Sequence, residues 1–110
     1  MQTWITQIRK GLVELSVMSA LCDEEAYGYQ IVERLGKAAG LEVTESTVYP
    51  VLARLARDRL VTVRTAPSPT GPARRYYRLS EAGRRRLVEM INHWHAIQDS
   101  VNQLTQGVLS

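Results

Sequence analysis

The chain has 110 residues, a formal net charge of +3, and 45% hydrophobic and 23% charged residues. This is the composition of a globular protein with one modest core. No apolar run approaches the ~20 residues of a membrane-spanning helix, and the first residues lack the charged-then-apolar layout of a secretion signal. Cys22 is the only cysteine, so an intrachain disulfide and a cysteine metal cluster are excluded. We expect a cytoplasmic protein with no cofactor, in which Cys22 is a buried, inert thiol.

The positive charge is concentrated in one part of the sequence. Between residues 41 and 86, ten arginines stand against four acidic residues, a local charge of +6, whereas the rest of the chain carries −3. Arginine is the cation suited to bidentate contacts with phosphate and guanine. Charge alone leaves two interpretations open, a nucleic-acid-binding surface and a merely solvated one. The order of the structural elements has to decide between them.

Three helices are predicted first. Apolar residues recur every three or four positions over residues 5–22, which indicates a helix with one buried stripe. A second helix begins at Gly28 and ends at Gly40. A third helix can be capped by the hydroxyl of Thr44 or of Ser46. Its start is expected near Ser46, because Pro50 is tolerable only within about the first turn.

A β-hairpin follows the helices. Residues 60–65 alternate and are rich in β-branched side chains, and residues 75–79 predict a second strand. Three prolines and a glycine in residues 66–72 predict an irregular tip. Of Tyr76 and Tyr77, one is expected to face the core and the other the solvent side, because neighbouring side chains alternate along a strand.

The last helix, which begins near Ser80, has the most regular pattern. Its apolar residues alternate by three and four, the spacing of a coiled-coil seam that would dimerise the chain: Leu87, Met90, Trp94, Ile97, Val101, Leu104 and Val108. Arg84, Arg85 and Arg86 are interpreted as a solvated first turn, since cations gain nothing from the dipole at a helix N-terminus. His93 and His95 point to different helix faces, so no shared metal is expected.

Three short helices, a two-stranded hairpin and a long helix predict a mainly α winged helix-turn-helix fold. We expect a DNA-binding domain over residues 1–80 and a C-terminal dimerisation helix over residues 81–110. In such folds the third helix enters the major groove and the hairpin lies along the backbone or in the minor groove. Small residues on the outer face of the third helix would allow close approach, and arginines would contact phosphate or guanine. The candidate contacts are Ser46, Thr47, Pro50, Ala53, Arg54, Arg57, Arg74, Arg75 and Tyr76.

Two other classes of function compete with DNA binding. An enzyme is disfavoured, since the sequence has no glycine-rich phosphate loop, metal-ligand spacing or paired catalytic residues. A winged-helix module that binds another protein instead of DNA is the alternative. Such a module would not need Arg54, Arg57, Arg74 and Arg75 beside small residues.

Three motifs in this order resemble the PadR family of bacterial transcriptional regulators. They are Tyr27–Ile31 (YGYQI), Ser46–Leu55 (STVYPVLARL) and Gly71–Gly83 (GPARRYYRLSEAG). The likeness extends from about residue 10 to residue 105 and is closest to the compact branch of the family with a single C-terminal helix. It departs from the family at Ser46, at Arg59, where a glycine is usual, and at Pro72, where an arginine is common.

The resemblance implies a homodimer that binds an inverted-repeat operator in double-stranded DNA, with repression as the family default and relief by a small effector. It also implies a proline within the third helix, and Tyr49 joins Ser46 and Thr47 as a contact with the DNA backbone. Some compact members stack flat aromatic ligands on a tryptophan at the place of Trp94. Ordinary packing of Trp94 is the alternative, and Trp4 is a second candidate for the same ligand site.

Overall fold

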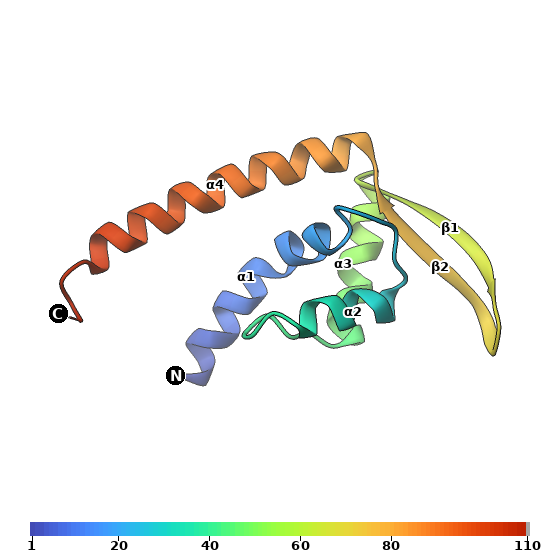
Figure 1. The fold of residues 1–110 in the computed structure, drawn as a ribbon, viewed down its shortest axis with the longest axis horizontal. Helices are drawn as coiled ribbons and strands as arrows, with labels where there is room; N and C mark the ends of the chain where they lie inside the picture. Colours follow the sequence, from blue (N-terminus) through green and yellow to red (C-terminus); the bar gives the residue numbers. More distant parts are fainter. Residues whose placement is uncertain (110) are drawn as a thin grey trace.

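The computed structural model describes residues 1–109. The elements follow in the order α1 (Gln2–Ala20), α2 (Gly28–Gly36), α3 (Glu45–Arg57), β1 (Val61–Ser68), β2 (Gly71–Leu79) and α4 (Glu81–Thr105). The first three helices form a compact body, the antiparallel β1–β2 hairpin projects from one end, and α4 runs beside α1 (Figure 1). The predicted winged helix-turn-helix class is confirmed.

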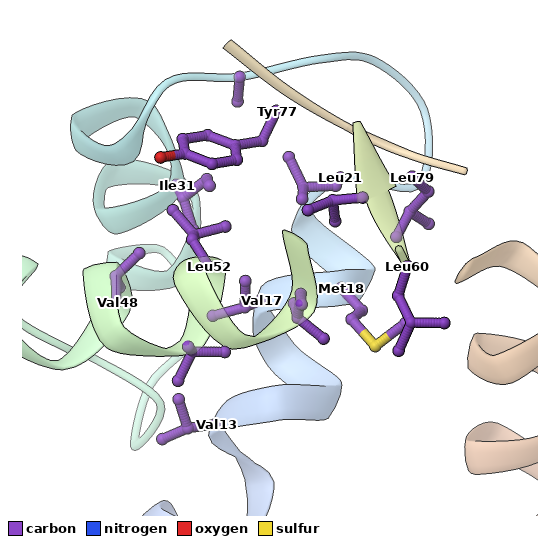
Figure 2. Close-up of a cluster of buried hydrophobic side chains, with 14 of the residues drawn as sticks. Val13, Val17, Met18, Leu21, Ile31, Val48, Leu52, Leu60, Tyr77 and Leu79 are labelled. Atoms are coloured by element: carbon purple, nitrogen blue, oxygen red, sulfur yellow. The ribbon is translucent and has the colours of Figure 1, made fainter. Parts of the chain in front are cut away.

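The core lies where the three helices meet the base of the hairpin (Figure 2). The stripe expected of α3 is buried, and the fully buried side chains include Met18 of α1, Ile31 of α2 and Leu52 of α3. The stripe expected over residues 5–22 is wrong except at Met18, because it includes the exposed Ile8 and Cys22, whereas the buried face of α1 consists of Val13, Ser16, Val17 and Met18. Tyr77 is buried and Tyr76 half-buried, as the strand alternation predicts. Leu87 of α4 belongs to the same core, so the first turns of α4 are packed on the helical body.

The start of α3 differs from the prediction. The helix begins at Glu45 and Thr44 occupies its N-cap position, but no capping hydrogen bond forms with a side chain: the Thr44 Oγ1 atom lies 2.8 Å from the Ser46 Oγ atom instead. Pro50 is therefore well inside the helix, not in its first turn. Pro50 cannot donate to the Ser46 carbonyl, but both residues are exposed, so water can satisfy that oxygen.

The end of α3 is a Schellman turn. The Leu60 amide donates to the Leu55 carbonyl at 2.9 Å, and the Arg59 amide donates to the Ala56 carbonyl at 3.1 Å. Arg59 has a φ of 61°, in the left-handed region that favours glycine. This explains why a glycine is usual here in the family that the sequence resembles.

The hairpin is longer than the sequence predicts. Pairing continues to Ser68 and Gly71, with the register shifted between Ala66 and Ser68, so the expectation of an irregular segment over residues 66–72 is wrong. Prolines fit because each strand of a two-stranded ribbon has a free edge, and Pro67 falls at the irregularity.

Two details of the helices also correct the predictions. The first helix ends at Ala20, so Leu21 is buried while Cys22 lies exposed in the following turn; the expectation of a buried thiol is wrong. The second helix ends at Gly36 rather than Gly40, and Gly40, with a φ of 87°, belongs to the loop before α3. Among residues 1–109, no helix is long and apolar enough to cross a membrane.

The junction between β2 and α4 is tightly built. The Ser80 hydroxyl accepts a hydrogen bond from the Gly83 amide at 3.0 Å and donates one to the Arg59 carbonyl at 2.8 Å. Gly83 packs against the Leu60 backbone so closely that a Cβ atom there would collide with the Leu60 carbonyl oxygen. Arg84 donates to the Cys22 carbonyl at 3.1 Å, so this arginine links α4 to the turn after α1 and is not merely solvated.

Candidate nucleic-acid interface

The predicted contact face of α3 is open to solvent. Apolar residues on the opposite side bind the helix to the core, so the remaining positions point outward. All the polar, small and basic residues proposed from the sequence are exposed: Ser46, Thr47, Tyr49, Pro50, Ala53, Arg54 and Arg57.

Tyr49 lies on the side of α3 that faces the hairpin. Its ring occupies the space above Gly28, where a Cβ atom would come within 2.5 Å of the Tyr49 hydroxyl. Burial raises the pKa of the Tyr49 phenol above its ordinary value of 10.0, with smaller contributions from Glu45 and Tyr77. The hydroxyl is therefore a proton donor at neutral pH, suited to a phosphate oxygen.

A hollow between α3 and β2 brings the two predicted DNA-binding elements together. It has a volume of about 350 Å³. Tyr49 lies on one wall and Arg74 and Arg75 lie on the other, with Tyr27, Gly28, Ala73 and Tyr77 completing the lining. A tyrosine of α3 and two arginine residues of β2 thus line one concave surface, although the two arginine side chains leave β2 on opposite faces.

The two arginines of α3 have different surroundings. Arg57 is exposed and lies 3.8 Å from the neighbouring Asp58 carboxylate. Arg54 lies on the flank of α3 that faces α1, where its Nη2 atom is 3.4 Å from the Glu14 carboxylate. The acidic partner of Arg54 lies forty residues earlier in the chain, and the sequence analysis did not identify it.

The hairpin carries a cluster of stacked side chains on its outer face. The Arg74 guanidinium lies 4.5 Å from the centre of the Tyr27 ring, and the Tyr27 and Tyr76 rings meet edge to face at 5.4 Å. The Arg64 guanidinium lies 4.7 Å from the centre of the Tyr76 ring on its other side. Arg75 alternates with Arg74 along β2 and is exposed on the opposite face.

Arg64 ends this cluster in an ion pair. Its Nη2 and Nε atoms donate to the Glu25 carboxylate at 2.5 and 3.2 Å. This bidentate pairing lowers the pKa of Glu25 below its ordinary value of 4.5, so the carboxylate is ionised at neutral pH. In the sequence Arg64 is only one cation of the basic segment, whereas in the structure Glu25 neutralises it, so not all of that charge is available to a ligand.

A second, apolar groove lies between α1 and α4, away from the hairpin. It has a volume of about 530 Å³. Trp4 and Ile8 from α1 meet Trp94, Ile97 and Val101 from α4 there. The structure therefore places both tryptophans that the sequence analysis singled out in one groove.

The predicted seam of α4 divides into two parts. Leu87 is buried in the core of its own chain, and Met90 and Trp94 are half-buried. The C-terminal residues of the seam are exposed: Ile97 at 56%, Val101 at 49% and Leu104 at 83%. Val108 lies beyond the end of α4 at Thr105.

Residues 17–89, from α1 into α4, match the model of the transcriptional regulator PadR-like family. This match covers more than half of the chain. The chain belongs to the PadR-like family of transcriptional regulators. Membership confirms the resemblance seen in the three motifs, and it confirms that the chain is a regulator and not an enzyme.

Known regulators resemble the chain over most of its length. It is 34% identical to the transcriptional regulator Rv3488 of Mycobacterium tuberculosis over 83 residues, 76% of each chain. The crystal structure of a PadR family regulator from Eggerthella lenta has a TM-score of 0.85 at 29% identity, covering 96% of this chain and 92% of that one.

A more distant PadR-like structure was determined with DNA. Bacillus subtilis PadR in complex with operator DNA has a TM-score of 0.67 at 23% identity, over 73% of this chain and 46% of that protein. At this identity the likeness concerns the fold.

Proposed function

We propose that this PadR-like chain binds an inverted-repeat operator as a homodimer and represses transcription until a small aromatic or hydrophobic effector releases it. The observation that carries the proposal is the hollow in which Tyr49 of α3 meets Arg74 and Arg75 of β2. The proposal places the chain where the chromosome lies, in the cytoplasm.

In this proposal α3 enters the major groove and the hairpin contacts the adjacent backbone. Ser46, Thr47 and Ala53 are small and exposed, so the helix backbone can approach the base edges closely. Contacts with phosphate or guanine are assigned to Arg54, Arg57, Arg74 and Arg75, and supporting backbone contacts to Tyr49, Pro50 and Tyr76. The complex of Bacillus subtilis PadR with operator DNA supports this use of the fold.

The dimer is assigned to α4 and the N-terminal part of α1. The exposed apolar residues Ile97, Val101 and Leu104 follow the half-buried Trp94 along one face of α4 at coiled-coil spacing. A row of large apolar side chains open to water marks an interaction surface. A second copy of the same face fits it, because a two-fold dimer pairs identical patches and an inverted-repeat operator has the same symmetry. Residues 1–80 then form the DNA-binding unit and residues 81–110 the dimerisation helix, of which Ser110 lies outside the described residues.

The groove with Trp4 and Trp94 is the proposed effector site. Its volume of about 530 Å³ is within the range of small-molecule pockets, and its lining is mostly apolar. An indole face that is only half-buried offers a stacking surface for a flat aromatic compound.

DNA binding is tested by selection from a pool of random duplexes with the full chain. We expect an inverted repeat to be enriched, with an affinity that falls with salt at a log–log slope steeper than about −3.5, the value for four neutralised phosphates. No enriched sequence and a flat salt dependence would favour the protein-binding module instead.

Effector binding is tested by tryptophan fluorescence against a panel of planar aromatic compounds. The proposal expects quenching that Trp94→Leu abolishes, and release of the selected duplex by the same compounds. If no compound quenches the fluorescence, Trp94 is a packing residue of the dimer.

A further inference from the structure

The segment between α1 and α2 is attached to β2 by a single antiparallel bridge between Ala26 and Tyr77. Ala26 and Tyr77 exchange two backbone hydrogen bonds of 3.0 and 2.8 Å, and Ala26 is fully buried. Because neighbouring side chains of an extended segment alternate, Glu25 and Tyr27 both point to the opposite side from Ala26. They therefore meet the outer face of the hairpin.

On that outer face, Glu25 and Tyr27 contact side chains from both strands. Glu25 holds Arg64 of β1 by two hydrogen bonds, and Tyr27 contacts the Tyr76 ring and the Arg74 guanidinium of β2. Arg64 and Tyr76 are directly opposite each other in the register, so their stacking joins the two halves of the cluster.

We propose that Glu25 and Tyr27 are positioning residues of the hairpin: they set its angle to the helical body, while Arg64 serves as their structural partner and not as a DNA contact. The consequence is that Arg74 and Arg75 are held at a defined distance from α3, so that helix and hairpin engage one stretch of DNA together. The effect on DNA binding rests on the proposed function, whereas the attachment of the hairpin by Glu25 and Tyr27 does not.

The charge of Glu25 allows a clear test, because the proposal and simple electrostatics predict opposite changes in DNA affinity when that charge is removed. Removal of an acidic group beside a DNA-binding surface ordinarily strengthens binding, and it would also release Arg64 to contact a phosphate. If Glu25 positions the hairpin, Glu25→Gln weakens binding instead, although it makes the protein more positive.

The first measurement is the affinity of the selected duplex for the full-length protein. We expect Glu25→Gln to weaken it about two- to fivefold, and Tyr27→Leu to do the same through loss of the Arg74 and Tyr76 contacts. Asp23→Asn is the matched control, since it removes the same charge from an exposed position two residues away. The double variant Glu25→Gln, Arg64→Met should bind the duplex no more weakly than the weaker-binding of the two single variants, because the two residues act as a unit. Affinity equal to or above wild type for Glu25→Gln would overturn the proposal.

A second measurement needs no DNA. Amide hydrogen exchange of the free protein should be faster in Glu25→Gln at the β1–β2 pairs beyond Val63, with the protection of α1 and α3 unchanged. Unchanged exchange in the hairpin would refute the anchoring. Failure of the wild-type chain to bind any duplex would refute the proposed function, and the exchange measurement would still decide the anchoring.

Discussion

The Arg54 guanidinium on α3 lies 3.4 Å from the Glu14 carboxylate on α1. Their side chains are 44% and 33% exposed, and pairs of this kind contribute at most about 1 kcal/mol. A phosphate or a guanine can therefore replace Glu14 as the partner of Arg54. The Glu25–Arg64 pair differs, because two hydrogen bonds hold the Arg64 guanidinium to Glu25 and the same guanidinium lies against the Tyr76 ring.

Glu14→Gln is expected to strengthen operator binding modestly, by up to about fivefold, because Arg54 no longer has to leave an ion pair. Arg54→Ala should weaken it at least about fivefold. Titration of the selected duplex by fluorescence anisotropy measures both, with unfolding curves as the control for stability. Unchanged affinity in Arg54→Ala would remove Arg54 from the proposed contacts.

Gly83→Ala is expected to destabilise the chain by about 1–3 kcal/mol, because its methyl group would collide with the Leu60 carbonyl oxygen at the start of α4. Urea unfolding followed by circular dichroism measures the loss. Gly36→Ala is the control, since a methyl group at that helical position meets nothing within 4 Å. Equal stability of the two variants would contradict the close packing of α4 on the hairpin.

Arg59→Gly is expected to stabilise the chain. A non-glycine residue in the left-handed region destabilises the folded state by about 1–2 kcal/mol. Glycine removes this strain, but part of the gain is offset because glycine gives the unfolded chain more conformational freedom. We expect a higher midpoint of urea unfolding, with DNA binding unaffected because Arg59 is not among the proposed contacts. A lower midpoint would show that the Arg59 side chain contributes more than its backbone strain costs.

Ile97→Lys is expected to convert the proposed dimer into monomers, because it places a charge in the middle of the exposed apolar row of α4. Sedimentation at micromolar concentration distinguishes the two states. Val88→Lys is a suitable control, since Val88 is exposed on α4 but is not part of the seam. A wild-type chain that sediments as a monomer would refute the dimer itself.

Local patterns in the sequence were sufficient for the order of elements and for the core positions of α2 and α3, but not for the buried face of α1. The stripe of Val48, Val51, Leu52 and Leu55 is buried as periodicity requires, and Ser80 begins α4 as its capping chemistry indicates. The errors lie where a local rule meets tertiary context. Prolines were expected to end regular structure at the tip, but a two-stranded ribbon accepts them at its edges.

The candidate site shows the same division. The exposure of the candidate contact residues of α3 follows from the buried apolar stripe on the opposite face, so it could be predicted from the sequence. The partners of Arg54 and Arg64 lie 40 and 39 residues away, respectively, and no local pattern indicates such pairs. The sequence therefore did not distinguish Arg64 within the basic segment and indicated a solvated Arg84, whereas the fold assigns both arginines to contacts within the chain.

The most direct test of the account is the ratio of affinities for the selected inverted repeat and for a duplex of the same composition in shuffled order. The full-length chain should prefer the inverted repeat by at least about a thousandfold at physiological salt. Arg57→Ala combined with Arg75→Ala should remove most of that preference without unfolding the protein. A folded chain that binds both duplexes equally, or neither, would contradict the assignment of α3 and the hairpin as a sequence-specific DNA-binding surface.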